Sequence, residues 1–403
     1  MAVNLSKAFS SLVPDELDAA VLTHYVVTKN PVYKAKAYEI AEHSKYAEDP
    51  EVLYQAVQKN LFDVTDIPFP GPEPGTEKFT FIDLFAGIGG FRLALQNLGG
   101  LCVYSSEYDK YAQKTYLANF GETPFGDITK PETKAFIPKT FDILCGGFPC
   151  QPFSIAGVSK KNSLGRKHGF EDEKQGNLFF HVAEIIKKHR PKAFFLENVK
   201  NLVAHDKGNT FRVIKETLEE LNYSFDKAIL NGKHFVPQHR DRTIMVGFDK
   251  EVFGQNMKFD FSLVKLPEPD KKIKSILKEN VDPKYTLSDH LWNYLQEYSK
   301  KHKLKGNGFG FGLTNLEGIS RTISARYYKD GSEILIPQLG SNPRRLTPDE
   351  CAALQGYPVN KGKKSFRIPV SDNQAYKQFG NSVVTPLIEA VGDEIVTLLT
   401  KYQ

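Results

Sequence analysis

Four side chains in this sequence have types and positions that suit covalent catalysis. Cys150 follows the apolar run FDIL through the turn GGFP, and a cysteine thiolate on an exposed turn is a nucleophile. Glu197 lies near the end of the run KAFFLENV, where a carboxylate is costly unless it is paired or functional. Arg240 and Arg242 alternate in PQHRDR, and two adjacent guanidiniums favour a carboxylate or phosphate between them.

Each of these residues also has a structural interpretation. A single cysteine is most often a buried, inert residue, Glu197 could cap a helix, and PQHRDR could be a solvated charged run. If residues 235–242 are extended, Gln238, Arg240 and Arg242 share one face of the strand. The turn before Cys150 favours an exposed thiol over a buried one.

The segment FIDLFAGIGGFRLALQNLGG predicts a strand, a glycine-rich turn and a helix. Gly87, Gly89 and Gly90 would let the backbone approach a ligand at the start of the helix. The next strand ends in Glu107, whose carboxylate can accept hydrogen bonds from ribose hydroxyls. The third glycine of a dinucleotide fingerprint would fall at Arg92, so S-adenosylmethionine fits better than a nicotinamide dinucleotide. The alternative is a tight turn without a ligand.

The predicted elements explain how these residues come together. Between residues 79 and 248, short apolar runs alternate with helical patterns, which predicts an α/β domain with a doubly wound, mostly parallel sheet. The carboxyl edge of that sheet would carry Cys150 and Glu197. The predicted divisions of the chain are 1–65, an extension of short amphipathic helices; 66–78, a Pro/Gly linker; 79–250, the catalytic and cofactor-binding domain; 251–371, a loop-rich domain; and 372–403, a C-terminal helix that packs back on the sheet.

Composition places the chain among ordinary globular proteins. Of its 403 residues, 40% are hydrophobic and 25% charged, and no apolar run reaches the roughly 18 residues of a membrane span. The N-terminal region lacks the apolar core of a signal peptide, and the four cysteines have neither a disulfide nor a zinc spacing. We predict a cytoplasmic protein without membrane association or metal. The net charge of +5 permits a polyanionic partner without establishing one.

Nine sequence blocks in a fixed order resemble one family, the DNA cytosine-5 methyltransferases, from residue 79 to the C-terminus. The blocks read DLFAGIGG, SEYD, GDIT, GGFPCQPFS, GNLFF, FFLENV, PQHRDR, RRLTPDECAALQGYP and QFGNSV. The resemblance implies the S-adenosylmethionine-dependent methyltransferase fold, with 251–371 as a smaller target-recognition domain. It is closest to the Dcm branch, which methylates the inner cytosine of CCWGG, although residues 336–344 look shorter than in that branch.

The resemblance assigns a role to each matching residue. Cys150 would attack C6 of a cytosine, Glu197 would assist at N3, and Arg240 and Arg242 would anchor the substrate and the catalytic loop while C5 takes a methyl group. Glu107 would bind the ribose of S-adenosylmethionine, and Tyr108 would flank its adenine. The residues implied to hold this cofactor are Phe85, Gly87, Gly89, Glu107, Tyr108, Asp127, Ile128, Pro149, Leu178, Asn381, Ser382 and Val383.

A cytosine inside a duplex must be flipped out before a thiol can reach C6. We expect the polar, basic segment 154–173 to form a mobile loop that closes over the DNA. The candidate DNA-binding residues are polar or basic and lie in this loop, in PQHRDR and in the target-recognition domain: Ser154, Lys160, Arg166, Gln238, Arg321, Arg326 and Arg344. For RRLT the alternative is a helix cap, because Thr347 and Glu350 have the spacing of a capping box.

Other functions fit parts of the sequence. An RNA cytosine-5 methyltransferase would use the same motifs, and a non-catalytic DNA-binding regulator would keep the fold. A nicotinamide-dependent dehydrogenase is more distant because of Arg92. The basic second domain and the intact Cys150, Glu197 and Arg240 favour an enzyme that acts on double-stranded DNA. We expect it to act as a monomer, with a cognate restriction endonuclease as a potential partner.

Overall fold

A computed structural model of the chain describes residues 15–44, 47–62, 67–149, 178–306 and 310–402. Four predicted site residues, Cys150, Ser154, Lys160 and Arg166, lie outside the described residues. The same holds for the whole of the predicted loop at 154–173.

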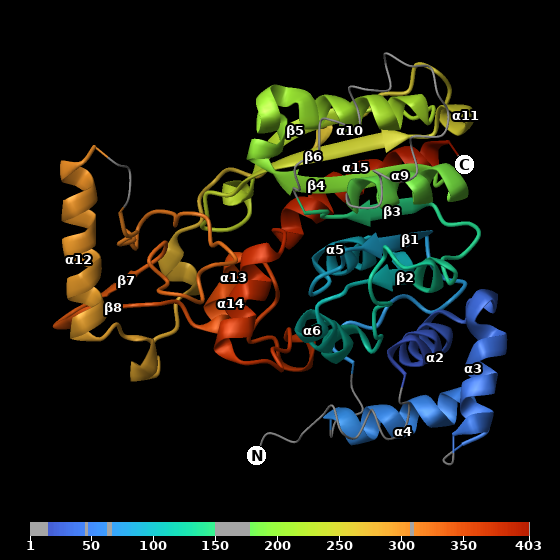
Figure 1. Ribbon diagram of the computed structural model, residues 1–403, viewed down its shortest axis with the longest axis horizontal. Coiled ribbons are helices and arrows are strands. Elements are labelled where there is room, and N and C mark those ends of the chain that lie inside the picture. The colour runs from blue at the N-terminus through green and yellow to red at the C-terminus, as the bar shows by residue number, and fades with distance from the viewer. Residues whose placement is uncertain (1–14, 45–46, 63–66, 150–177, 307–309, 403) are drawn as a thin grey trace.

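A six-stranded sheet forms the centre of the molecule (Figure 1). Its strands are β1 (Phe79–Leu84), β2 (Gly100–Ser106), β3 (Ile143–Gly146), β4 (Ala193–Val199), β5 (Asp226–Asn231) and β6 (Asp241–Phe248), in the order β2-β1-β3-β4-β6-β5. The first four strands are parallel, whereas β6 is antiparallel to both β4 and β5. The prediction of a mostly parallel sheet is therefore confirmed. The apolar runs did not predict β5, because it is an edge strand with the exposed side chains Lys227 and Ile229.

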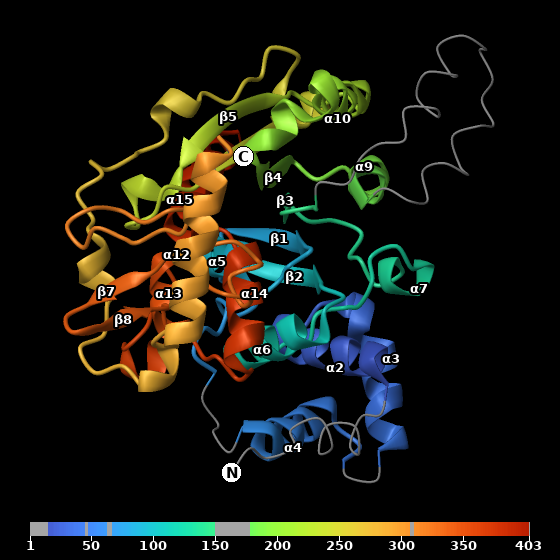
Figure 2. The same ribbon diagram turned by 60° about the vertical axis from the view of Figure 1, so that its left-hand side comes forward.

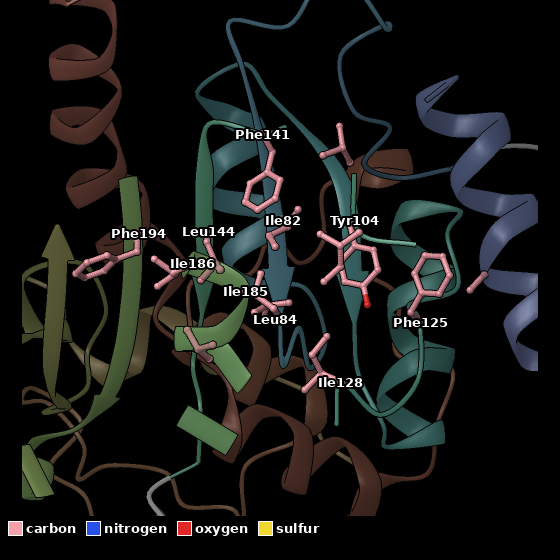
Figure 3. Close-up of a cluster of buried hydrophobic side chains, with 14 of the residues drawn as sticks. Ile82, Leu84, Tyr104, Phe125, Ile128, Phe141, Leu144, Ile185, Ile186 and Phe194 are labelled. Carbon is pink, nitrogen blue, oxygen red and sulfur yellow. The ribbon is translucent and has the colours of Figure 1, made fainter. Parts of the chain in front are cut away.

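Helices cover both faces of the sheet, as a doubly wound fold requires. The helices α5 (Gly90–Asn97) and α15 (Thr385–Lys401) pack on the face that carries Phe79 and Phe81. The helices α9 (Leu178–His189) and α10 (Asn209–Glu220) cover the opposite face. Figure 3 shows that second core, where Ile185 and Ile186 approach Ile82 and Leu144. Apolar residues of β1 thus fill two separate cores, Phe79 and Phe81 on one face and Ile82 and Leu84 on the other.

Short elements connect the strands of this sheet. They are α6 (Lys110–Phe120), α7 (Pro131–Lys134), η2 (Lys200–Val203), η3 (His205–Gly208) and η4 (Gly232–His234). The short helix α11 (Lys250–Phe253) follows β6, the last strand of this sheet along the chain. Helix α5 lies in the connection from β1 to β2, and α10 lies in the connection from β4 to β5. Because the first four strands are parallel, their carboxyl ends lie at the same edge of the sheet.

The N-terminal region forms three helices, α2 (Glu16–Thr28), α3 (Pro31–His43) and α4 (Pro50–Phe62). Helix α2 packs beside strand β2, and α3 and α4 pack against α2. A helical N-terminal region is confirmed, but α2 is not the amphipathic surface helix that we predicted. Every residue from 19 to 25 is buried, because α3, α4 and β2 surround this helix. The segment 67–78 contains neither a helix nor a strand. Within it, the ring of Phe69 packs against those of Phe120 and Phe366.

The region after β6 has mostly short elements (Figure 2). They are η5 (Phe261–Leu263), η6 (Ile273–Ile276), η7 (Pro283–Tyr285), α12 (Asp289–Leu304), β7 (Ile336–Gln338), β8 (Ser341–Arg344), α13 (Pro348–Leu354) and η8 (Gly362–Lys364). The 16-residue helix α12 is longer than the loop-rich pattern suggested. The C-terminal segment forms two helices, α14 (Asp372–Asn381) and α15, and α15 packs back on α5 and the sheet as predicted.

Candidate active site

A cavity of about 670 Å³ opens at the carboxyl ends of β1, β2, β3 and β4. Each of these strands continues into a segment that lines it, namely Phe85–Ile88, Ser106–Asp109, Gly147–Pro149 and Glu197–Val199. The segments Gly126–Thr129 and Gly380–Val383 complete the walls. Ligand sites of open α/β sheets lie at this edge, because the loops of neighbouring parallel strands converge there.

The glycine-rich turn after β1 holds the carboxylate of Glu107. The backbone N–H groups of Gly87 and Asp109 donate to its two carboxylate oxygens over 2.9 and 2.8 Å. Phe85 and Gly87 both have a φ of 55°, in the left-handed region that a non-glycine residue such as Phe85 seldom adopts. Such strain clusters at binding sites, and here it turns the backbone toward the cavity.

Gly89, which was predicted to contact the cofactor, does not line the cavity. Its φ is 84°, and a Cβ atom at this position would stand 2.2 Å from Cε2 of Phe120. The structure therefore requires glycine there for backbone conformation and for packing against α6. The other predicted cofactor residues all line the cavity: Phe85, Gly87, Glu107, Tyr108, Asp127, Ile128, Pro149, Leu178, Asn381, Ser382 and Val383.

The charged groups of the cavity suit a nucleoside without phosphates. Its three cationic side chains already have partners: Arg242 binds Glu197, Lys377 binds Asp109, and Arg240 binds backbone carbonyls. The carboxylates of Glu107 and Asp127 face the same space. Each cationic side chain among the described residues that line the cavity is therefore already paired and is not free to bind a diphosphate. Ribose hydroxyls and a sulfonium cation, by contrast, interact favourably with carboxylates. The residues present fit S-adenosylmethionine.

An ion pair between Glu197 and Arg242 also lines the cavity, and the part of the cavity beside this pair is called the catalytic end below. Arg242 Nε lies 2.7 Å from Glu197 Oε1, and the two side chains are 13% and 11% exposed. Burial raises the pKa of Glu197, whereas the charges of Arg242 and Arg240 act in the opposite direction. Burial thus favours the protonated form of Glu197, which is the form that a proton donor needs.

Arg240 connects three segments around this end of the cavity. Its Nη1 donates to the carbonyl of Ile323, and its Nη2 donates to the carbonyls of Gly380 and Ser382. The residue is 1% exposed. Arg240 therefore ties the start of β6 to the C-terminal end of α14 and to the region after residue 251.

Two residues predicted to contact DNA have other roles. Gln238 is fully buried, and its side-chain amide donates to the Leu354 carbonyl and accepts from the Ile323 N–H. Arg344 is buried and donates from both Nη atoms to the Glu350 carboxylate. The polar groups of both side chains are thus engaged inside the protein, and DNA contacts by Gln238 and Arg344 stay predictions. The capping-box interpretation of Thr347 and Glu350 is confirmed.

Arg321 and Arg326 are exposed, so DNA contacts by these two residues stay predictions. The segment that carries them adjoins the catalytic end of the cavity. The Ser320 N–H donates to the Pro237 carbonyl, and the Thr322 hydroxyl donates to the carbonyl of His239.

Asn198 is a site residue that the sequence reasoning missed. Its side chain is buried and donates from Nδ2 to the carbonyl of Phe148 over 2.8 Å. It therefore fixes the turn at Gly147–Pro149, which leads into Cys150. A polar residue directly after Glu197 in a buried strand was the available signal.

The three described cysteines are unsuited to nucleophilic attack. Cys102, Cys145 and Cys351 are buried, and burial raises the pKa of all three thiols, that of Cys102 to about 12. Cys150 lies one residue beyond Pro149, which lines the cavity. Within the described ranges, no His, Cys, Asp and Glu side chains cluster as metal ligands do. No helix in the same ranges has the length and hydropathy to cross a bilayer.

Known proteins resemble this chain over most of its length. The family model for the C-5 cytosine-specific DNA methylase matches residues 79–397. The DNA-cytosine methyltransferase of Escherichia coli (strain K12) is 46% identical over 379 residues, covering 81% of this chain and 79% of the relative. The Type II methyltransferase M.SsoII of Shigella sonnei is 51% identical, with coverages of 83% and 85%. The Type II methyltransferase M.HpaII of Haemophilus parainfluenzae is 47% identical, covering 85% of this chain and 95% of the relative.

Solved structures show the same fold at low sequence identity. The S. pombe Dnmt2 methyltransferase superimposes with a TM-score of 0.59 at 17% identity, covering 80% of this chain and 98% of the other. The Entamoeba histolytica methyltransferase EhMeth gives a TM-score of 0.58 at 19% identity, with the same coverages. At such identities the likeness concerns the fold alone.

Proposed function

This chain belongs to the C-5 cytosine-specific DNA methylase family, and we propose that it methylates one cytosine within a short sequence of duplex DNA by covalent catalysis. One observation carries the proposal. A single cavity joins the carboxylate of Glu107 to the Glu197–Arg242 pair, and the turn that precedes Cys150 forms part of its wall. A nucleoside cofactor and a flipped base can therefore occupy the two ends of one space.

The cofactor end would hold S-adenosylmethionine. Glu107 would accept hydrogen bonds from the ribose hydroxyls, and Tyr108 would flank the adenine. Asp127 and Ile128 would meet the adenine edge, the segment 381–383 would line the pocket, and Leu178 would close it. When bound there, S-adenosylmethionine supplies an electrophilic methyl group next to the catalytic end.

At the catalytic end, the chain would act on a cytosine flipped out of the duplex, at a cost of a few kcal/mol for unstacking and unpairing. The Cys150 thiolate forms a bond to C6, and Glu197 gives a proton to N3, so the displaced electron pair makes C5 nucleophilic. After C5 has been methylated, a base removes the C5 proton, the electron pair of that bond forms the C5–C6 double bond, and the Cys150 sulfur leaves C6 as thiolate. N3 returns its proton to Glu197. Arg242 orients Glu197 throughout, and Arg240 holds the surrounding backbone.

The proposed target is the inner cytosine of CCWGG. The motif likeness to the Dcm branch supports it, as does the 46% identity to the DNA-cytosine methyltransferase of Escherichia coli. Relatives named Type II methyltransferases support a restriction-modification context with a cognate endonuclease. We further propose that the protein acts on DNA as a monomer, with Arg321 and Arg326 among its DNA contacts.

Expression in a host that lacks cytosine methylation tests the proposal. Bisulfite sequencing of host DNA should show protected cytosines at the second position of CCWGG and nowhere else. Protection at another sequence would overturn the target, and methylation of tRNA without methylation of DNA would overturn the substrate. The Cys150→Ala variant serves as the control, since it should lose methylation and keep specific DNA binding.

A further inference from the structure

The N-terminal helices supply hydrogen bonds to strand β2 at the edge of the sheet. Among the described strands, β2 has only one neighbour, β1, so part of its backbone lacks a ladder partner. The Tyr33 hydroxyl donates to the carbonyl of Val103 over 2.6 Å, and Nε2 of His24 lies 3.2 Å from the backbone nitrogen of Ser105. Two buried side chains from α2 and α3 thus complete the edge of the sheet.

The contacts of His24 define its tautomer. Its Nδ1 lies 2.8 Å from the Ala20 carbonyl, which can only accept, so Nδ1 carries a proton. Burial lowers the pKa of His24, which keeps the ring neutral. Nε2 is therefore an acceptor, and the Ser105 N–H donates to it. Glu122, whose Oε2 is 3.3 Å from Nε2, pairs through its other oxygen with Arg92 of α5.

Ser105 lies directly before two residues of the cofactor cavity, Ser106 and Glu107. The Ser105 carbonyl accepts from the Phe125 N–H, and the Phe125 carbonyl accepts from the Glu107 N–H, each over 2.8 Å. Phe125 in turn precedes the lining segment Gly126–Thr129. The two walls that would bind ribose and adenine are therefore joined to each other through Ser105 and Phe125.

The ring of His24 contacts the second of these walls as well. Its centroid lies 4.8 Å from that of Phe125, which also stacks on Tyr104 at 4.8 Å. Figure 3 shows Phe125 between Tyr104 and an N-terminal helix. One residue of α2 thus supports both cofactor-binding segments, by a hydrogen bond to one and by ring contact with the other.

We propose that His24 is a positioning residue for S-adenosylmethionine binding, and that helix α2, which carries it, is a functional part of the cofactor site. His24 acts through Ser105 and Phe125, without touching the cofactor. The inference rests on the proposed use of S-adenosylmethionine and does not depend on the DNA target.

Calorimetric titration of the DNA-free protein with S-adenosylmethionine tests this role. His24→Leu removes the acceptor for the Ser105 N–H. It should weaken S-adenosylmethionine binding about tenfold and raise the KM for S-adenosylmethionine by the same factor. The kcat at saturating cofactor should not change, because the lost interaction is shared by the bound state and the transition state. His24→Gln, which can place an oxygen near the position of Nε2, should restore most of the affinity. His24→Asn is too short to reach Ser105 and should resemble His24→Leu, which keeps the test available if the leucine variant does not fold.

Tyr33→Phe is the matched control, since it removes a hydrogen bond at the same sheet edge two residues before Ser105. It should lower the unfolding midpoint while leaving cofactor affinity unchanged. The proposal is overturned if His24→Asn and His24→Leu bind the cofactor as the wild type does, or if Tyr33→Phe weakens binding as much. A wild type that binds S-adenosylmethionine but methylates no DNA would instead contradict the proposed function.

Discussion

Two of the arginine–glutamate pairs among the described residues have different surroundings. Arg242 and Glu197 meet at 2.7 Å at the cavity, with side chains 13% and 11% exposed. Arg344 and Glu350 meet at 2.8 Å at the start of α13, with side chains 6% and 0% exposed. All four residues lie in motifs of the family. Of the two pairs, only the first lines the 670 Å³ cavity.

In the second pair, hydrogen bonds from neighbouring groups of the protein occupy the Glu350 carboxylate. Glu350 accepts from both Nη atoms of Arg344 and also from the Thr347 N–H, which closes the capping box of α13. Glu197 has Arg242 as its ion-pair partner and Gly147 beside it, where a Cβ atom would stand 3.3 Å from Oε2. The comparison teaches that a buried ion pair becomes a candidate for catalysis only where one of its members faces a cavity.

Replacing Glu197 tests the catalytic side of this comparison. Glu197→Gln keeps the shape of the side chain and an acceptor for Arg242 but cannot give a proton to N3. The methylation rate should fall about 10²–10⁴-fold, the usual contribution of a general acid. Methyl transfer to duplex DNA measures the rate, and thermal unfolding should remain close to that of the wild type. A variant with normal turnover would remove Glu197 from the mechanism.

The same substitution in the second pair should affect stability instead. Glu350→Gln leaves the buried guanidinium of Arg344 without its carboxylate, which costs about 3–5 kcal/mol of folding free energy. Urea unfolding measures this loss. At low temperature the folded variant should methylate DNA at the wild-type rate. A large loss of rate without a loss of stability would place Glu350 in the chemistry and end the contrast between the pairs.

Replacing the exposed Arg326 should affect DNA binding, in contrast to the substitutions in the two ion pairs. Arg326→Ala should weaken DNA binding by about 1–3 kcal/mol if the side chain reads a base, or lower the salt slope by about 1 if it meets a phosphate. Binding titrations at several salt concentrations distinguish these cases. Arg212→Ala on α10, also exposed, is the control and should bind DNA normally. Equal losses in both variants would argue against a specific contact.

A buried carboxyl group without an ion-pair partner extends the comparison. Asp83 is 1% exposed, its Oδ2 has no hydrogen-bond partner among the described residues, and burial raises its pKa to about 8. The folded state then binds this proton more tightly than the unfolded chain, so ionisation of Asp83 costs stability as the pH rises. Between pH 6 and pH 8 the wild type should lose about 2 kcal/mol through this group.

Asp83→Asn removes that titration. Its unfolding free energy should therefore change less between pH 6 and pH 8 than that of the wild type, as measured by urea unfolding at both values. An identical pH dependence of the two proteins would mean that Asp83 is ionised in the folded state at neutral pH.

The parts of the fold that the sequence predicted depend on local patterns. The apolar runs of β1 to β4 and β6 are buried on both faces, and the glycine-rich turn has the required positive φ angles. The sequence could not show that α2 is buried on most sides, because that depends on packing by α3, α4 and β2. It also could not separate Gln238 and Arg344 from Arg326, since exposure is set by tertiary contacts that are distant along the chain.

The central claim is that Cys150, at the end of the turn held by Asn198, attacks C6 of a cytosine beside Glu197. Duplex DNA with 5-fluorocytosine at the target position tests it most directly, because the fluorine blocks the elimination that would release the enzyme. With S-adenosylmethionine present, intact-mass and peptide analysis should find one DNA molecule bound through the peptide that contains Cys150. A protein that methylates normal DNA but forms no adduct, or forms it through another residue, would contradict the account.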